Sequence, residues 1–231
     1  MDFKQTLSFD DVLLVPRASN IKTREEVTLN CSIGSANFKI PIIASPMDTV
    51  TEAEMMVSMA RRGGLGIMHR YKTCEEQVKI LRNARDELEM ESSASVSRLS
   101  AAIGASKESI TRAGHLIDAG ARLICVDVAH GHHTLVEKTI KSLRDLHGES
   151  ISIIAGNVAT PKGYSDLSEW GADAVRIGIG GGSICSTRIQ TGHGVPTFQS
   201  VYDCRDTAGA AIIADGGIKT SGDIVKALAA G

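Results

Sequence analysis

The stretch Ala174-Val-Arg-Ile-Gly-Ile-Gly-Gly-Gly-Ser-Ile-Cys185 joins an apolar, β-branched run to a glycine-rich loop that ends in a cysteine. The run has the length and composition of a strand covered on both faces. Glycines let backbone N–H groups approach an anion closely, because no Cβ stands in the way. A thiol beside a bound phosphate is a nucleophile directed at a phosphorylated small molecule. We therefore expect a strand that carries a reactive cysteine, Cys185, beyond its carboxyl end.

The same unit of apolar run, polar or glycine-rich loop and helical pattern recurs along the chain. The expected core strands are Pro41–Ala44, Leu65–Met68, Leu99–Ile103, Leu123–Val128, Ser152–Ala155, Ala174–Ile179 and Ala211–Ala214. The helical segments between them carry start signals. Thr51-x-x-Glu54 predicts a capping box, and Thr160-Pro161 predicts an N-cap followed by proline in the first turn. Strands and helices thus alternate over the whole chain.

This alternation predicts an α/β protein with a parallel sheet and helical crossovers. An open doubly wound sheet and a closed barrel share the same local pattern. Loops with polar or glycine residues after nearly every strand favour the TIM (β/α)8 barrel, whose site is built from many strand ends. Only seven core strands are found, and the chain stops at Ala229-Ala230-Gly231. We expect a barrel truncated after about seven βα units, with two unpaired edges, unless the sheet is open or another chain completes it.

Residues 1–231 are expected to form a single catalytic barrel domain. Residues 1–40 form an N-terminal extension, in which Val27–Leu29 and Phe38–Ile40 are predicted to pair as a hairpin over the barrel floor. Residues 85–97 are polar and rich in serine and glutamate, which indicates a linker.

Composition excludes several classes of function. The net charge is −2 and aromatic residues are 3% of the chain, so neither a basic face nor a base-stacking platform for nucleic acid is indicated. The five cysteines are odd in number and lack paired spacing, which argues against a disulfide framework or zinc site and favours a reducing compartment. No apolar run is long enough to span a membrane and the N-terminus lacks signal-peptide features, so a cytoplasmic protein is expected.

The cysteine loop resembles the active-site loop of the IMP dehydrogenase/GMP reductase family, Gly-Ile-Gly-x-Gly-Ser-Ile/Val-Cys-Thr-Thr-Arg. It departs at Gly181, where proline is usual, and at Ser186, where threonine is usual. Six further segments resemble the family in the right order, and all but the first follow a predicted strand: Phe9–Pro16, Ser45–Glu52, Gly64–Arg70, Asp127–His132, Gly156–Thr160 and Asp215–Ile218.

The resemblance implies a site for a purine nucleotide monophosphate. Cys185 would be the catalytic nucleophile that adds to C2 of the purine, and Thr187 would assist proton transfer. Substrate-binding residues would contact the phosphate, the ribose and the base: Ser183, Gly216 and Gly217 for the phosphate, Asp215 for the ribose hydroxyls, and Ser45 and Met47 for sugar and base. Alternative readings stay open, with Asp215 as a turn or capping residue and Met47 as a core residue.

The resemblance also implies a nicotinamide cofactor. Asp127, Asn157 and Arg176 would lie on its side of the site, and His69 would stack against it unless that histidine is structural. The carbonyls of Gly180, Gly182 and Cys185 match positions that bind a monovalent cation in the family, so K⁺ is a possible ligand; a merely flexible loop is the alternative.

The implied reaction is NAD-dependent oxidation of IMP to XMP in guanine nucleotide biosynthesis. The alternative within the family is GMP reductase, which converts GMP to IMP with NADPH. The segment Asp127-Val-Ala129 resembles the end of the fourth strand in that branch. An unrelated phosphate-binding barrel enzyme, such as an isomerase, and a non-catalytic nucleotide-binding homologue also remain open. The family implies a homotetramer. The paired CBS domains that most dehydrogenases insert near residues 85–97 are absent, and the residues that resolve the intermediate lie beyond strand eight, so slow or no turnover is expected of these residues alone.

Overall fold

The computed structural model describes residues 5–90 and 98–231. The strands are β1 (Cys31–Ile33), β2 (Ala36–Phe38), β3 (Ile43–Ala44), β4 (Leu65–Met68), β5 (Ser100–Ile103), β6 (Leu123–Asp127), β7 (Ser152–Val158), β8 (Ala174–Ile177) and β9 (Ala211–Ala214). The α-helices are α1 (Ala53–Arg61), α2 (Cys74–Glu89), α4 (Lys107–Asp118), α5 (Thr134–His147), α6 (Pro161–Glu169), α7 (Thr187–Thr191), α8 (Thr197–Cys204) and α9 (Ser221–Ala230). Short 3₁₀ turns lie at Phe9–Asp11, Arg24–Glu26 and Gly148–Ser150.

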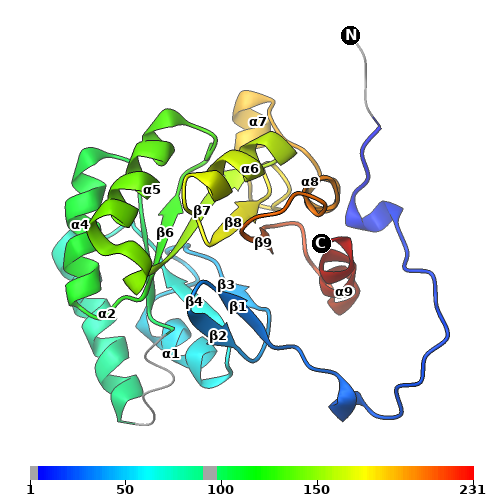
Figure 1. Cartoon of the computed structure of the whole chain (residues 1–231), viewed down its shortest axis with the longest axis horizontal. Coiled ribbons are helices and arrows are strands. Elements are labelled where there is room, and N and C mark those ends of the chain that lie inside the picture. The colour runs from blue at the N-terminus through cyan, green and yellow to red at the C-terminus, as the bar shows by residue number, and fades with distance from the viewer. Residues whose placement is uncertain (1–4, 91–97) are drawn as a thin grey trace.

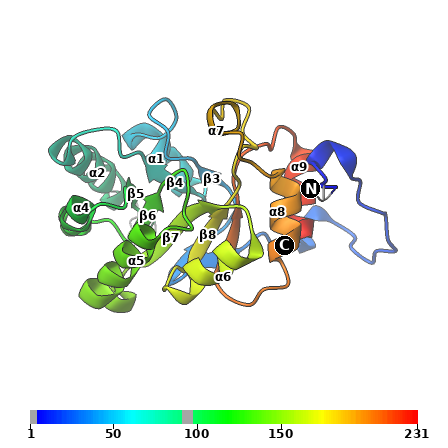
Figure 2. The ribbon, with the colours of Figure 1, turned by 90° about the horizontal axis from the view of Figure 1, so that it is seen from above.

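The central sheet has seven strands in the order β3-β4-β5-β6-β7-β8-β9, and every neighbouring pair is parallel. The sheet is curled, and helices lie around its outer side (Figures 1 and 2). Each strand is followed by a crossover that returns the chain to the start of the next one. The predicted fold is confirmed: the molecule is a curled βα sheet of the TIM-barrel type with seven strands.

Side chains alternate between the two faces of this sheet, as the period of two requires. In β6, Ile124 and Val126 belong to the large apolar cluster that the helices cover. Leu123 and Cys125 belong to a second cluster on the inner face. The inner face of the curled sheet is therefore mostly apolar near the amino ends of the strands, where Ser100 and Ser152 donate their hydroxyls to backbone carbonyls, and charged side chains take inward positions toward the carboxyl ends.

The N-terminal hairpin is formed by β1 and β2, with Cys31 paired to Phe38. The sequence prediction was wrong about its first strand, since Val27–Leu29 forms no strand and is exposed, and the second strand ends at Phe38, where the prediction had it begin. The hairpin turns at Gly34, whose φ of +53° suits glycine. Ser152, the first residue of β7, donates its hydroxyl to the carbonyl of Ile33 at 3.1 Å. The hairpin thus lies against the amino-terminal ends of the strands.

Strands β3 and β9 are the edge strands of the sheet, because each pairs with only one neighbouring strand among the described residues. A groove of about 500 Å³ lies between them and is lined mainly by apolar side chains from both edges and from α9. All four residues of β9 are half-buried, whereas those of β8 are buried. The edge strands are therefore the least covered part of the sheet.

The structure confirms one of the two predicted helix N-termini and contradicts the other. Thr160 caps α6 as predicted and accepts a hydrogen bond from the Gly163 amide at 3.2 Å. The capping box predicted at Thr51 is wrong, because α1 begins after Glu52 and the Thr51 hydroxyl instead donates to the carbonyl of Ser45 at 2.7 Å.

Helix α2 continues to Glu89, so the first five residues of the expected 85–97 linker are helical; residues 91–97 lie outside the described residues. No helix in the described ranges is both long and apolar enough to cross a membrane.

Candidate active site

A cavity of about 560 Å³ opens at the carboxyl ends of the parallel strands. Its walls come from the segments that follow β3, β4, β6, β7, β8 and β9. Nearly all residues predicted for the site line it: Ser45, Met47, Asp127, Asn157, Arg176, Gly180, Gly182, Ser183, Cys185, Thr187, Asp215, Gly216 and Gly217. Residues spread over 173 positions of sequence meet here because the carboxyl ends of parallel strands share one rim.

Arg176 is the most buried charged group of this cavity, with 8% of its side chain exposed. It lies in β8 two residues after Ala174, which faces the inner cluster, so the alternation turns the arginine inward. Its Nη1 donates to Asp127 Oδ1 at 2.6 Å and its Nη2 donates to Asp215 Oδ2 at 3.0 Å. Burial acts to lower the pKa of the Arg176 guanidinium. The neighbouring Cys125, Asp215 and Asp127 outweigh burial and hold that pKa above its ordinary value. The arginine is thus a permanent cation between two carboxylates.

Asn157, near the carboxyl end of β7, contacts the same carboxylate. Its side-chain amide donates to the carbonyl of Gly178 at 2.7 Å and also to Asp215 Oδ2. Gly178 has a φ of +151°, and a Cβ there would lie 2.1 Å from the carbonyl oxygen of Asp215. Only glycine fits at this position, which brings the cysteine loop and the Asp215 turn into direct contact.

Cys185 lies in a loop that is held by a hydrogen bond between residues close in sequence. Its amide donates to the Gly182 carbonyl at 3.1 Å, which tightens the turn before the cysteine. Burial acts to raise the pKa of the Cys185 thiol, but the Thr187 hydroxyl and backbone N–H groups, including that of Thr187, lower it below its ordinary value. A thiolate is the nucleophilic form of cysteine, so this loop favours a reactive sulfur.

The other cysteines lie in different surroundings. Cys125 and Cys204 are buried, and burial raises the pKa of their thiols to about 12 and about 11. These two cysteines therefore pack as small buried hydrophobic residues. Cys31 and Cys74 are only half-buried.

The turn after β9 packs against the cysteine loop. Gly216 and Gly217 both have a φ of +79°. A Cβ on Gly216 would lie 3.1 Å from the Gly182 amide nitrogen, and one on Gly217 would lie 3.0 Å from the Gly181 carbonyl oxygen. Two glycine turns therefore face each other at the mouth of the cavity, beside the exposed Ser183. This pairing of small residues and backbone amides is suited to a phosphate group.

His69 does not lie where the sequence placed it. It follows the last residue of β4, Met68. The ring is fully buried; Nε2 lies 3.1 Å from Glu52 Oε1, and Nδ1 accepts the Tyr71 amide. The expectation that His69 stacks on a cofactor is therefore not supported by its position.

Arg70 and Tyr71 line the cavity instead, and sequence reasoning missed both. The guanidinium of Arg70 lies 5.2 Å from the centre of the Tyr71 ring. Arg70 Nε lies 3.6 Å from Asp127 Oδ2, and it is buried without a hydrogen-bond partner among the described residues. A donor without a hydrogen-bond partner, on a residue that lines a cavity, is suited to an anionic or carbonyl group of a ligand. The signal in the sequence was a basic and an aromatic residue directly after a strand.

Two of the three carbonyls proposed for a monovalent cation accept hydrogen bonds within the protein. The Gly180 carbonyl accepts Arg188 Nη1 at 2.8 Å, and the Gly182 carbonyl accepts the Cys185 amide. A guanidinium on the Gly180 carbonyl repels a second cation at close range, so a cation at this loop would have to displace Arg188 from that carbonyl. The described residues also hold no cluster of three or more His, Cys, Asp or Glu side chains suited to a metal ion.

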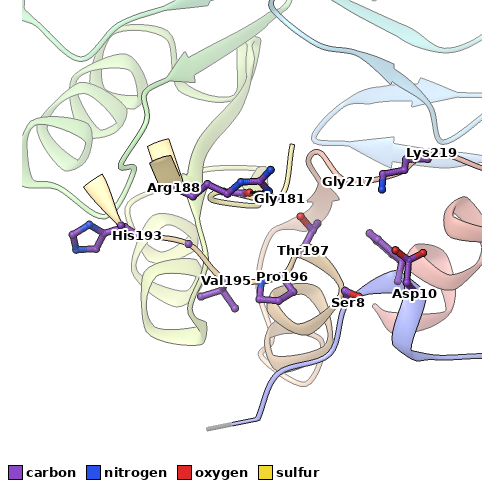
Figure 3. A pocket seen from close by; sticks show the side chains of 14 residues that line it. Ser8, Asp10, Gly181, Arg188, His193, Val195, Pro196, Thr197, Gly217 and Lys219 are labelled. Atoms are coloured by element: carbon purple, nitrogen blue, oxygen red, sulfur yellow. Dashed lines mark hydrogen bonds between the residues drawn. The ribbon is translucent and has the colours of Figure 1, made fainter. Parts of the chain in front are cut away.

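A second cavity of about 380 Å³ lies on the other side of the cysteine loop. Figure 3 shows it between the N-terminal segment, with Ser8 and Asp10, and the segment that contains Arg188 of α7 and, after that helix, His193. Gly181 and Gly217 line both cavities. The cysteine loop thus separates the two cavities, and Thr197, the first residue of α8, packs against Gly181 of this loop.

A curled βα sheet with its polar cavity at the carboxyl ends of the strands defines an α/β-barrel protein of the kind that acts on small molecules. The profile of the family described as "IMP dehydrogenase / GMP reductase domain" matches residues 6–231. The chain belongs to this family.

Several relatives are named inosine-5'-monophosphate dehydrogenase. The one from Cryptosporidium parvum is 39% identical over 264 residues, which cover 97% of this chain and 65% of the relative. Those from Staphylococcus aureus (strain MW2) and Halalkalibacterium halodurans are 32% and 33% identical, and each match covers 99% of this chain and 72% of the relative. The chain therefore spans only about two thirds of the length of these relatives. The staphylococcal match extends over 351 residues against the 231 of this chain, so that relative carries segments within the matched span that have no counterpart here.

Proposed function

We propose that this chain carries the nucleotide site of an oxidoreductase that converts IMP to XMP with NAD⁺. The observation that supports it most directly is the position of Cys185, whose thiol pKa is lowered, in one cavity with the Asp215 carboxylate and the Gly216-Gly217 turn. The names of the relatives favour IMP among purine nucleotides.

In this proposal the nucleotide binds along the rim from β9 to β3. The phosphate is held by the Ser183 hydroxyl and by the amides of Gly216 and Gly217. The ribose hydroxyls donate to the Asp215 carboxylate, and Ser45 and Met47 contact the sugar and the base. All these residues line the same cavity, and this leaves the purine ring within reach of the cysteine loop.

The chemical step begins with a proton leaving the Cys185 thiol. The thiolate adds to C2 of the purine, which forms a carbon–sulfur bond, and C2 loses its hydrogen as hydride. NAD⁺ would supply the acceptor for this hydride. Water then adds to C2 and loses a proton, the carbon–sulfur bond breaks, and the thiolate leaves with XMP formed. The thiolate takes back one of the two protons given up by the thiol and the water, so one proton is released per turnover and the atoms and electrons balance. The Thr187 hydroxyl, beside the sulfur, stabilises the thiolate before addition and after release.

NAD⁺ would bind on the side of the cavity formed by Asp127, Asn157 and Arg176. The structure fits such a ligand through the buried Nε of Arg70, which has no hydrogen-bond partner among the described residues, and through the exposed ring of Tyr71 beside it. A nicotinamide ribose or carboxamide offers oxygen acceptors for such a donor.

Reduction of GMP with NADPH is the second candidate. The family description includes GMP reductase, and the segment Asp127-Val128-Ala129, which resembles the reductase branch, lines the cavity. A cytoplasmic location, assembly into a homotetramer and slow or absent turnover of these 231 residues alone stay predictions. K⁺ stays a prediction as well, and no step is assigned to it.

The experiment that tests this proposal measures a single turnover rather than a steady state. The chain is mixed with excess IMP and NAD⁺, and NADH is followed by fluorescence in parallel with GMP plus NADPH. We expect a burst that approaches one NADH per chain with IMP, and no burst with Cys185→Ala. Consumption of NADPH with GMP alone would assign the reductase reaction. Absence of both signals, together with no IMP binding by calorimetry, would contradict the proposal.

A further inference from the structure

The inward face of the cavity contains a row of alternating charges that runs across the strand ends. Arg176 pairs with Asp127 on one side and with Asp215 on the other. Arg70 extends the row beyond Asp127. In the proposed function, Asp215 belongs to the IMP side and Asp127 to the NAD⁺ side. The single guanidinium of Arg176 therefore contacts both halves of the site.

The strand register explains how one arginine reaches so far. Asp127 in β6 is paired with Gly156 in β7, and Gly156 is paired with Arg176 in β8. A Cβ on Gly156 would lie 2.7 Å from the Cβ of Arg176. Since glycine has no side chain, the arginine crosses over β7 and meets Asp127 at 2.6 Å. Any larger residue at position 156 would occupy this path.

On the other side, Arg176 is paired in register with Ile213 of β9, and Asp215 follows two residues later. The contact from Nη2 to Asp215 Oδ2 is 3.0 Å. The two terminal nitrogens of one planar group thus hold two carboxylates at a fixed separation. A lysine offers a single point charge and cannot reproduce this fork.

Each carboxylate keeps a defined oxygen for other partners. Asp215 Oδ2 accepts both Arg176 and Asn157, while no described residue donates to its Oδ1. Asp127 Oδ1 accepts Arg176, and its Oδ2 faces Arg70 at 3.6 Å. Arg176 therefore determines which oxygen of each carboxylate is presented to the cavity.

We propose that Arg176 is a positioning residue that fixes the IMP-side carboxylate of Asp215 and the NAD⁺-side carboxylate of Asp127 relative to each other, so that binding at both subsites depends on it. This inference rests on the proposed function. Without the guanidinium, the two carboxylates, which are 16% and 23% exposed, lose the cation between them and repel each other. Both turn away from their binding orientation, and the two ligands are lost together.

The test measures IMP and NAD⁺ affinities by calorimetry on the full 231-residue chain. Asp215→Asn should weaken IMP binding by roughly tenfold and change NAD⁺ binding by less than about twofold, while Asp127→Asn should do the reverse. Arg176→Met should weaken both ligands by roughly tenfold or more. Arg176→Lys should recover at most one of the two affinities. If Arg176→Met does not fold, as judged by circular dichroism, Arg176→Gln and Arg176→Lys provide the same comparison.

A double-mutant cycle separates positioning from a merely structural role. Adding Asp215→Asn to Arg176→Met should weaken IMP binding by less than about twofold further, because the two residues act as one unit. Fully additive losses, or an Arg176 variant that changes only one affinity or neither, would overturn the inference while leaving the proposed function intact. A wild-type chain that binds neither ligand would overturn the proposed function and this inference with it.

Discussion

Replacing Thr187 by valine tests how the loop activates Cys185. The Thr187 hydroxyl is the strongest of the groups that lower the pKa of the thiol, ahead of the backbone N–H groups. Valine keeps the shape of the side chain and removes this donor. The pKa of Cys185 should therefore rise toward its ordinary value, while the amide contacts of the loop remain.

The magnitude follows from the energy of one hydrogen bond to an ionised group. Such a bond contributes about 1.5–3 kcal/mol, and a half-buried site justifies the low end. About 1.4 kcal/mol corresponds to a rise of about one pKa unit, hence about tenfold less thiolate at a pH below both pKa values. A thiolate becomes about threefold more nucleophilic for each pKa unit by which its thiol is more basic. The net alkylation rate should fall about threefold at low pH and rise about threefold above both pKa values.

The assay is the pH profile of iodoacetamide alkylation, with the modified peptide quantified by mass spectrometry. Cys185→Ala gives the background from Cys31 and Cys74, which are half-buried. Thr187→Ser is the matched control, because it retains the hydroxyl and should keep the wild-type midpoint. A Thr187→Val profile whose midpoint is unchanged or shifted down would refute the role assigned to this hydroxyl.

Three further perturbations have defined outcomes. Gly178→Ala places a Cβ 2.1 Å from the Asp215 carbonyl oxygen, so it should lower the free energy of unfolding in urea by about 2 kcal/mol or more. The control is Gly114→Ala in α4, where no atom lies within 4 Å of the new Cβ and the free energy of unfolding should rise by about 0.5–1 kcal/mol. Equal effects of the two substitutions would contradict the close approach at Gly178. Arg144→Met removes bonds to the carbonyls of Gly171, Gly148 and Ile151 and to Asp173, and should cost about 3 kcal/mol in the same assay; a cost below about 1 kcal/mol would show that solvent replaces them. The backbone amides of Lys219 and Thr220, before α9, lower the pKa of Asp223. Its stabilising contribution is therefore present above the ordinary aspartate pKa of 3.8 and is lost as the pH falls through the lower folded value. Asp223→Asn should reduce the fall in unfolding free energy between neutral and acid pH, and an unchanged fall would exclude this group.

Much of the fold could be predicted because each core strand is a short apolar run bounded by glycine or polar residues. Strands β4 and β9 match their predicted ranges. The hairpin was misplaced because Val27–Leu29 has strand-like composition but no core to pack against. The true strands flank the Gly34 turn, and their side chains Ile33 and Phe38 belong to the inner cluster. Local composition does not reveal which apolar run finds such a partner.

The site could be predicted where residues directly follow strands, since parallel strand ends converge on one rim. Asp127, Cys185 and Asp215 meet for that reason. The sequence left two roles open for His69, a cofactor contact and a structural role, because its partner Glu52 lies 17 positions away and on a different segment. The pairing of Arg176 with Asp127 likewise depends on the register of three strands, which the sequence pattern does not fix.

The most direct test of the account is whether a purine nucleotide becomes covalently attached to Cys185. The chain is incubated with IMP and NAD⁺, quenched in acid, digested and analysed by mass spectrometry. We predict a nucleotide adduct on the peptide that contains Cys185, formed in step with NADH and missing when NAD⁺ is omitted or when Cys185 is alanine. NADH formation without any adduct, or an adduct on a different cysteine, would contradict the assignment of Cys185 as the nucleophile.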